Sequence, residues 1–453
     1  MIVYIIMNID GVAADQNPWW ESPSTRPVQR LTQRRDLFDR LYSAVGHPQQ
    51  SRAQILLGPR QVGKSTLLLQ IAGKLLEDGV TPSNVTFFDF ADDRLEARSV
   101  SPREVVGLSA PGLVENAPRY FLFDEITWAK PGWDRWIKQA IDADRRTDSQ
   151  SASRFILTSS SASLLRDTSL ESGQGRWDSH SLEGMTFPEY ARLSPNKGPE
   201  MELRYLRTSG FPGQLWEDDL ILARKRLRED ISDRAILHDL LVHDVDVARV
   251  RTLFTYLVQT SGNQWAAEKR AQDLDADPRT ASQWLHLLVQ TGLITALPRW
   301  TPGKSGKPGQ ASTELRAHPK IYASDHGLVL AFAAQAAEDP QLQGRILETV
   351  VYRHLRSVRD DDHDIAYFRA DDRYEIDFVT SVNGDSIGVE VTSAKTVDDE
   401  KLAKVAAAGL RLGAKRLLVV HGGLFEGERR GIQLIPRHRF LSDPRAALSA
   451  GAR

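Results

Sequence analysis

"AQILLGPRQVGKST", residues 53–66, decides the fold of the N-terminal part of this chain. A short apolar run is followed by a loop that fits the pattern GxxxxGK[ST], and an amphipathic segment, "KSTLLLQIAGKLLEDG", continues from residue 64. A strand before this pattern and a helix after it are the context in which it forms a phosphate-binding loop. We therefore predict an ATP site built from Gly58, Pro59, Arg60, Gln61, Val62, Gly63, Lys64, Ser65 and Thr66.

Two side chains of the loop have expected roles. The Lys64 ammonium should reach the β- and γ-phosphate oxygens from a solvated position, and the Ser65 hydroxyl should bind Mg²⁺. The backbone N–H groups near Gly63 would surround the phosphates at a helix N-terminus. The alternative is a glycine loop with a structural role alone.

The segments around the loop alternate between apolar runs and helical stretches. "VTFFDF" (85–90), "YFLFDEI" (120–126) and "RFILTSS" (154–160) have the composition of buried strands. This rhythm predicts an α/β domain, in which a parallel sheet carries helices on both faces.

Candidate catalytic residues follow two of these strands. Asp124 could complete the Mg²⁺ shell and Glu125 could activate the attacking water, although paired acids at a strand end can also be solvated or cap a helix. Ser159, with Ser160 next to it, could sense the γ-phosphate or orient water; alternatively, these serines cap the next helix. Arg176 could be an arginine finger, in cis or from a neighbouring subunit, or an ordinary surface arginine.

The tryptophans of "NPWW" (17–20) precede the predicted sheet. Trp19 and Trp20 are expected to pin the N-terminal arm to the domain, because aromatic side chains contribute mainly buried area. The alternative is that they pack over the adenine of ATP.

A basic segment follows the predicted sheet. Residues 248–322 contain three helical patterns and two strand-like stretches around "TPGKSGKPGQ", and their basic residues outnumber the acidic ones, which favours a winged helix. Its third helix offers Arg279, Ser282, Gln283 and His286 for contact with duplex DNA. Winged helices also bind proteins, so a protein partner is the alternative.

"EIDFVTSVNGDSIGVEVTSAK", residues 375–395, almost spells the site of a Mg²⁺-dependent nuclease of the PD-(D/E)xK type. Asp377 and Glu390, joined by Glu348 from a helix, would be its carboxylates, but Thr392 stands where the lysine is expected. Lys395, three residues further on, could swing back from the strand end, which keeps an active site as the alternative. Without a cation to position water, we predict a nuclease fold that does not cut, although its three carboxylates could still gather Mg²⁺.

Most of the chain resembles the prokaryotic AAA-type ATPases that combine an N-terminal ATPase domain with a C-terminal domain of unknown function. The matching stretches are "GPRQVGKSTLL", "FDEI", "ILTSSSASLL", "LEGMTFPEY", "TSGFPGQLW", "KIYASDHGL", "GRILETVVYRHL" and "YEIDFV". The resemblance implies a P-loop NTPase fold, then a winged helix, then a mixed α/β domain with a restriction-endonuclease-like fold. The expected segments are an arm (1–30), the ATPase domain (31–195), a helical lid or linker (196–247), the winged helix (248–322) and the C-terminal domain (323–453).

Composition narrows the remaining possibilities. The chain has no cysteine, which excludes disulfides and thiolate metal sites, and "MIVYIIM" at residues 1–7 is too short for a membrane span. We expect a cytoplasmic ATPase that acts as a nucleotide-dependent switch on DNA or a protein partner, with a homo-oligomer as one open arrangement. The alternatives are an ATP-gated nuclease and an ATP-driven protein scaffold without nucleic acid.

Overall fold

The computed structural model divides the chain into two compact units, Met1–Glu183 and Gly184–Arg453. The segment "MIVYIIM", expected to be an early strand or a disordered start, lies outside the described residues. So does Lys304, a basic residue of the predicted winged helix that we expected to contact DNA phosphates. The structure describes residues 9–25, 27, 33–47, 52–95, 99–108, 110–146, 152–160, 175–229, 245–301, 310–311, 318–333, 338–358, 365–371, 373–382 and 384–449.

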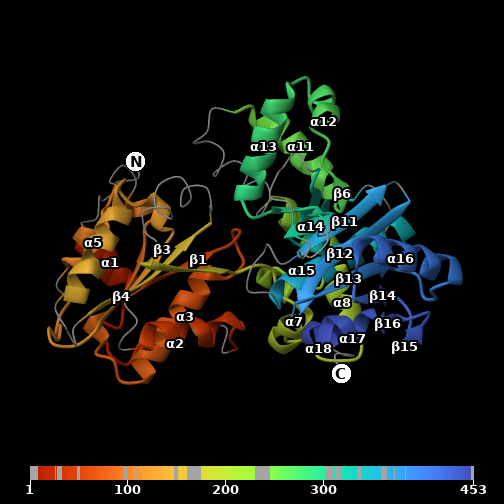
Figure 1. Ribbon diagram of the computed structural model, residues 1–453. Helices are drawn as coiled ribbons and strands as arrows, with labels where there is room; N and C mark the ends of the chain where they lie inside the picture. Colours follow the sequence, from red (N-terminus) through yellow and green to blue (C-terminus); the bar gives the residue numbers. More distant parts are fainter. Residues whose placement is uncertain are drawn as a thin grey trace. The chain divides into compact units, whose positions relative to one another are not determined.

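The first unit is built on a parallel five-stranded sheet in the order β2-β3-β4-β1-β5 (Figure 1). Its central strands are almost wholly buried, as their continuous apolar sequences require when helices cover both faces. The predicted P-loop NTPase fold is confirmed. The strands are β1 Ala53–Leu57, β2 Val85–Asp89, β3 Arg119–Asp124, β4 Ser153–Ser159 and β5 Trp177–Ser181.

Helices lie on both faces of this sheet (Figure 1). The helix after the phosphate loop buries Leu67, Leu68 and Ile71 at helical spacing and packs against β2 and β3. The helix that joins β3 to β4 buries Ile137 and Ile141 and packs against β4. The helices of this unit are α1 Ile9–Gln16, α2 Leu37–Gly46, α3 Lys64–Glu77, α4 Pro102–Val106 and α5 Trp133–Arg146.

The N-terminal arm covers the edge strand β2. Both indole N–H groups, of Trp19 and Trp20, donate to the Val85 carbonyl at 2.9 Å. The Asn17 side chain accepts from Phe87 N–H at 2.6 Å and donates to Phe87 O at 2.7 Å, so its amide continues the ladder of the sheet. These contacts agree with the structural interpretation of "NPWW" and protect an edge that would otherwise expose backbone groups.

The second unit begins with short helices and a three-stranded antiparallel sheet in the order β6-β10-β7. Within this segment, α11 and α13 bury apolar stripes, including Leu253, Phe254 and Leu288, against each other and the sheet. The elements are α7 Phe187–Leu193, α8 Met201–Arg207, α9 Leu220–Arg226, α11 Val247–Gln259, β6 Asn263–Gln264, α12 Ala267–Asp273, α13 Pro278–Gln290, β7 Ile294–Leu297, β8 Trp300–Thr301, β9 Gln310–Ala311 and β10 Lys320–Ala323.

The same unit ends in a mixed six-stranded sheet in the order β11-β12-β13-β14-β16-β15, as the predicted C-terminal α/β unit requires. α15 packs against β13, and α16 packs against β12 (Figure 1). No helix in the described part of the chain has the length and apolar character to cross a membrane. The elements are α14 His326–Phe332, α15 Pro340–Ser357, β11 Ile365–Asp371, β12 Tyr374–Val382, β13 Asp385–Thr392, α16 Asp399–Leu412, β14 Arg416–His421, β15 Gly427–Arg429, β16 Ile432–Pro436, α17 Arg437–Ser442 and α18 Pro444–Ser449.

Candidate active site

The phosphate loop leaves the carboxyl end of β1 and enters α3. Gly63 precedes the first helical residue with a φ of 96°, and Gln61 also has a positive φ, of 63°. Glycine adopts such a conformation without steric cost, so the turn into the helix requires it at position 63. The loop therefore ends where the N–H groups of a 14-residue helix can bind an anion.

Lys64 lies inside the loop, with only 5% of its surface exposed, whereas the sequence had suggested a solvated side chain. Its ammonium donates to Gly58 O at 2.8 Å and to Pro59 O at 3.1 Å. It is also 3.8 Å from the carboxylate of Glu125. The positive charge is thus held at the centre of the loop, next to the expected catalytic acid.

The second component of the site is Asp124, at the carboxyl end of β3. Its side chain is buried, and burial raises its pKa, while hydrogen bonds from Ser65 and Thr158 oppose that rise. The Thr158 hydroxyl donates to Asp124 and accepts from the backbone N–H of Glu125 at 3.0 Å. The two predicted Mg²⁺ ligands, Ser65 and Asp124, are therefore in direct contact.

Glu125 has an unusual backbone. Its φ of 47° and ψ of 50° lie in the left-handed region, which costs a non-glycine residue free energy and is frequent at functional sites. The Ser160 hydroxyl donates to its carboxylate at 2.9 Å, and the Ser160 N–H donates to the same oxygen at 3.2 Å. The carboxylate is thus oriented from the end of β4 while it remains partly exposed.

A third acid stands beside this pair. Asp89 ends β2 and lies opposite Asp124 in the strand register. Burial, then the negative charges of Asp124 and Glu125, raise the pKa of Asp89 to about 7. Crowded carboxylates of this kind favour a cation among them.

The donor set fits Mg²⁺ and a nucleoside triphosphate. A hydroxyl and a carboxylate oxygen are the hard ligands that Mg²⁺ prefers, and it commonly takes one or two of them from the protein and the rest from phosphates and water. Among the described residues, no group of three or more His, Cys, Asp or Glu side chains is arranged to hold a metal on its own. Lys64 and the N-terminus of α3 suit the phosphates.

Comparison with known proteins agrees with this geometry. Residues 50–191 match the family model of an AAA domain. The matched residues contain both the phosphate loop and the acid pair. Residues 202–339 and 343–440 match two domains of unknown function, DUF8612 and DUF4143.

Two relatives that align with more than half of this chain are distant in sequence. An uncharacterized protein of Haemophilus influenzae is 22% identical over 61% of this chain and 68% of its own length. An uncharacterized protein of Methanocaldococcus jannaschii, MJ1544, is 22% identical over 73% of this chain and 72% of its own. A solved Walker-type ATPase of Pyrococcus abyssi aligns with 69% of this chain and 99% of its own at 16% identity, with a TM-score of 0.39. That score is too low to bear on the arrangement of this chain.

Thr158 and Ser160 contact the acid pair of the AAA domain, whereas the sequence favoured Ser159. Ser159 is buried and lies 3.5 Å from the Thr127 hydroxyl, whereas Thr158 reaches Asp124 and Ser160 reaches Glu125. Sequence analysis missed Thr158 and placed Ser160 second. The run of hydroxyl residues that begins at Thr158 carried a signal, but the sequence did not say which of them faces the acids.

We expect Thr158→Val to slow ATP hydrolysis about 10- to 100-fold, because a hydrogen bond to a charged group contributes roughly 1.5–3 kcal/mol. Valine keeps the β-branched shape and removes only the hydroxyl. Phosphate release at saturating ATP measures the effect. Thr158→Ser should keep most of the parental rate, because it retains the hydroxyl. Ser159→Ala is the matched control at the neighbouring position. If Ser159→Ala hydrolysed ATP more slowly and Thr158→Val kept the parental rate, the catalytic role would belong to Ser159.

Arg176 lies at the wrong end of the sheet to act in its own AAA domain. It immediately precedes β5, its carbonyl accepts from Ala53 N–H, and its guanidinium pairs with Asp142 at 2.9 Å. Ala53 begins β1, whose five residues separate it from the phosphate loop by about 16 Å. This corrects the expectation of a finger in cis; a role in a neighbouring subunit stays a prediction.

The predicted nuclease carboxylates of the second unit do lie together, but with cations that sequence analysis missed. The buried Lys320 ammonium, from β10, is 3.0 Å from Asp377, 3.4 Å from Glu348 and 2.7 Å from Glu375. Glu390 pairs instead with Lys401, at the start of α16. The expectation of three carboxylates without a nearby cation was therefore wrong.

This cluster has too few cations for its acids. Burial, and then the charge of Asp377, raises the pKa of Glu348 to about 7 and that of Glu390 to about 8. Burial lowers the pKa of Lys320, but the acidic groups around it raise the value well above the ordinary one. Lys320 thus stays charged in the space between Glu348 and Asp377.

Lys395 does not join this cluster. It lies on an exposed turn beyond the end of β13, three residues after Thr392, and Thr392 is only partly buried at the strand end. The structure therefore brings together Glu348, Asp377 and Glu390 of the predicted set and leaves Lys395 outside it. Lys320 escaped the sequence analysis because it belongs to a different sheet, far from the acids in the sequence.

Proposed function

We propose that this AAA protein is an ATP-hydrolysing switch whose nucleotide state regulates the C-terminal unit. The observation that supports it most is the meeting of Lys64, Ser65, Asp124 and Glu125 at the carboxyl ends of β1 and β3. The loop after β1 thus supplies a phosphate cradle, and β3, which β4 separates from β1 in the sheet, supplies acids for metal binding and for proton transfer.

In this proposal each side chain has one task. The loop N–H groups and Lys64 bind the phosphates of ATP, and Ser65 and Asp124 hold Mg²⁺. When bound, Mg²⁺ neutralises charge on the phosphate oxygens. Glu125, oriented by Ser160, accepts the proton of the attacking water, and Thr158 fixes the distance between the two acids.

The rate of ATP hydrolysis with and without duplex DNA tests the proposal and its output together. Turnover that duplex DNA changes identifies DNA as the regulated partner. Turnover that DNA leaves unchanged directs the output to a protein partner. Absence of Mg²⁺-dependent turnover in both conditions would contradict the proposal.

DNA is a candidate output because of the segment between α11 and β10. The order α11, β6, α12, α13, then β7 and β10 of the same sheet, is typical of a winged helix and supports this candidate; the pair β8-β9 lies between β7 and β10 in the sequence. Arg279, Gln283 and His286 lie on one exposed face of α13. Two other basic residues are engaged elsewhere, since Arg249 pairs with Asp246 and Arg270 pairs with Asp273. The contact with DNA should therefore be made mainly to phosphates, by few residues.

We expect Arg279→Glu to weaken duplex binding equally at all sequences and to lower the slope of the salt dependence by about one, because one phosphate is no longer neutralised. Binding of short labelled duplexes at several salt concentrations measures this. Lys404→Glu, on the exposed face of α16, is the control with the same change of charge. If the parent does not retain DNA even at low salt, with or without ATP, DNA is excluded as the output and a protein partner is favoured.

Nuclease activity is not part of this proposal. Lys320 is buried among Glu348, Glu375 and Asp377, so an ammonium already occupies the space between carboxylates that a catalytic metal would need. We expect no cleavage of supercoiled DNA, single-stranded DNA or RNA in Mg²⁺ or Mn²⁺ above an Asp377→Ala control, with or without ATP. Cleavage that requires Asp377, Glu390 and Lys395 would overturn this expectation.

A further inference from the structure

The chain passes from the AAA domain to the second unit through four residues, Leu182–Met185, each of which is held by its backbone. Leu182 and Glu183 belong to the first unit, and Gly184 and Met185 belong to the second. We propose that this segment, together with Arg35, is the coupling element through which nucleotide at the phosphate loop regulates the C-terminal unit. The inference rests on the proposed ATP-dependent switch and names its route.

On the first side, the segment is fastened to the phosphate loop itself. Leu182 N–H donates to the Leu57 carbonyl at 2.7 Å, immediately before the loop. A Cβ atom at position 58 would lie 1.9 Å from the Leu182 carbonyl oxygen, so only glycine fits there. The first glycine of the loop is therefore needed for this close approach of two backbones as well as for the phosphates.

Arg35 makes a second attachment on this side. Its buried guanidinium donates to Val62 O, in the loop, at 3.0 Å and to Glu183 O at 2.8 Å. One buried side chain thus bridges the middle of the phosphate loop and the last residue of the first unit. A shift of the loop on nucleotide binding would move Glu183 through this bridge, because the planar guanidinium fixes the geometry of both bonds.

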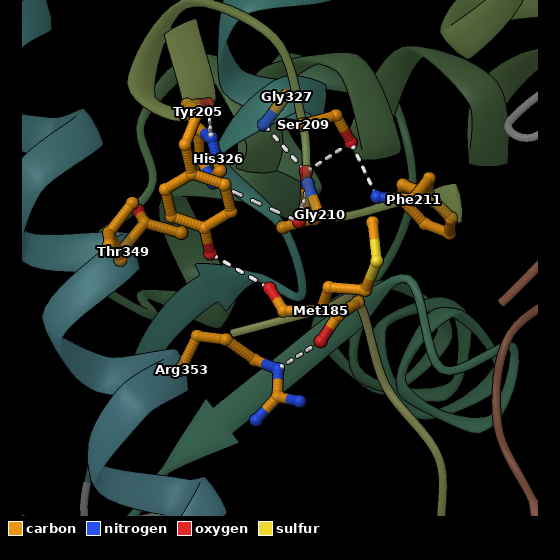
Figure 2. Close-up of polar contacts among 12 residues, drawn as sticks. Met185, Tyr205, Ser209, Gly210, Phe211, His326, Gly327, Thr349 and Arg353 are labelled. Carbon is orange, nitrogen blue, oxygen red and sulfur yellow. Dashed lines mark hydrogen bonds and ion pairs between the residues drawn. The ribbon is translucent and has the colours of Figure 1, made fainter. Parts of the chain in front are cut away.

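On the second side, Gly184 and Met185 are held by the elements that follow. Gly184 O accepts from Arg353 Nε of α15 at 2.8 Å, Met185 O accepts from the Tyr205 hydroxyl at 2.8 Å, and Met185 N–H donates to Gly210 O at 2.6 Å. Figure 2 shows the Tyr205 and Arg353 side chains directed at this backbone. Side chains of two helices, α8 and α15, therefore bind the backbone of this segment directly.

A buried carboxylate fixes the partners of the segment. Asp325 accepts from the Ser209 hydroxyl at 2.7 Å, from Gly210 N–H at 2.9 Å and from Gly327 N–H at 2.7 Å. Its neighbour His326 contacts the Tyr205 carbonyl at 2.7 Å (Figure 2). Such a satisfied network in a low-dielectric interior is rigid, so the chain segments that it joins are expected to move together.

The start of α7 is held by the same region. His354 of α15 accepts from Phe187 N–H at 2.9 Å, two residues after Met185. Burial lowers the pKa of His354 to about 3, so the ring stays neutral and keeps this acceptor at physiological pH. The stretches "LEGMTFPEY", "TSGFPGQLW", "KIYASDHGL" and "GRILETVVYRHL", whose roles the sequence left open, all supply residues to this one network.

Hydrogen exchange of the intact protein with Mg²⁺ and a non-hydrolysable ATP analogue tests the coupling. In the parent, the analogue should protect amides of the loop, residues 58–66, and change the exchange rates of slow amides in α14 and α15 by about 5-fold or more, the lower range of allosteric coupling. Tyr205→Phe removes the hydroxyl that binds Met185 O. In this variant we expect the analogue to leave the exchange rates of α14 and α15 almost unchanged, while it still protects the amides of the loop.

Tyr190→Phe is the matched control, because Tyr190 is equally buried and its ring centroid lies 5.1 Å from that of Tyr205, but its hydroxyl makes its hydrogen bonds elsewhere. Arg35→Lys should give the same loss from the loop side. If Tyr205→Phe and Arg35→Lys respond like the parent, or if the loop is protected without any change in α14 and α15, the coupling element is refuted. If the loop itself is not protected, the proposed ATP site has failed instead.

Discussion

Replacing Glu125 with glutamine is expected to slow ATP hydrolysis by roughly 10²- to 10⁴-fold and to leave ATP binding intact. The carboxamide oxygen can still accept the hydrogen bonds that Ser160 donates, so the side chain should keep its place. It cannot accept a proton from water. Phosphate release measured at saturating ATP, beside equilibrium binding of ATP, separates the two effects.

The control for this variant is Glu115→Gln, which makes the same chemical change on an exposed loop of the same unit. It should hydrolyse ATP at the parental rate. Parental turnover in Glu125→Gln would assign proton transfer to another group, with Asp124 or a residue of a neighbouring subunit as the next to test.

Removal of the Lys64 side chain should abolish ATP binding. Lys64 supplies the only ammonium inside the described loop, 2.8 Å from Gly58 O. Lys64→Ala removes this positive charge from the site expected to bind the β- and γ-phosphates. A ligand at 100 times its Kd stabilises the folded protein by about 2.7 kcal/mol, and this gain should disappear in the variant. Thermal unfolding with and without Mg-ATP measures the difference.

Lys74→Ala is the matched control on the same helix, where the ammonium pairs with Asp78 on the surface. It should keep the full stabilisation by Mg-ATP. Since Lys64 is buried, its removal could also lower the stability of the free protein, so the comparison is the shift caused by Mg-ATP in each variant and not the melting temperature itself. An equal shift in Lys64→Ala and the parent would mean that the phosphate loop is misassigned.

The sequence predicted the phosphate loop and the acid pair because their geometry is local. A glycine-rich turn between a strand and a helix can bend in few ways, and Asp124 ends the strand next to β4 in the same sheet. The position of Arg176 could also have been inferred. A residue just before a parallel strand lies at the amino end of the sheet, away from the loops that follow the strands.

Other parts of the site depend on pairings that the sequence does not contain. Thr158 and Ser160 share a face of the β4 segment that Ser159 does not, and only the position of β3 shows which face meets the acids. Lys320 and Lys401 come from separate elements and meet the carboxylates only through tertiary packing. The same is true of the network around Asp325, whose partners Ser209 and Gly210 lie more than a hundred residues away in the chain.

The central claim is that this chain turns over ATP at its phosphate loop, and the rate of phosphate release from ATP by the purified parent tests it most directly. We predict release that saturates with ATP, requires Mg²⁺ and is abolished both in EDTA and in Lys64→Ala. Release that is absent in Mg²⁺, or that persists unchanged in Lys64→Ala, would contradict this claim.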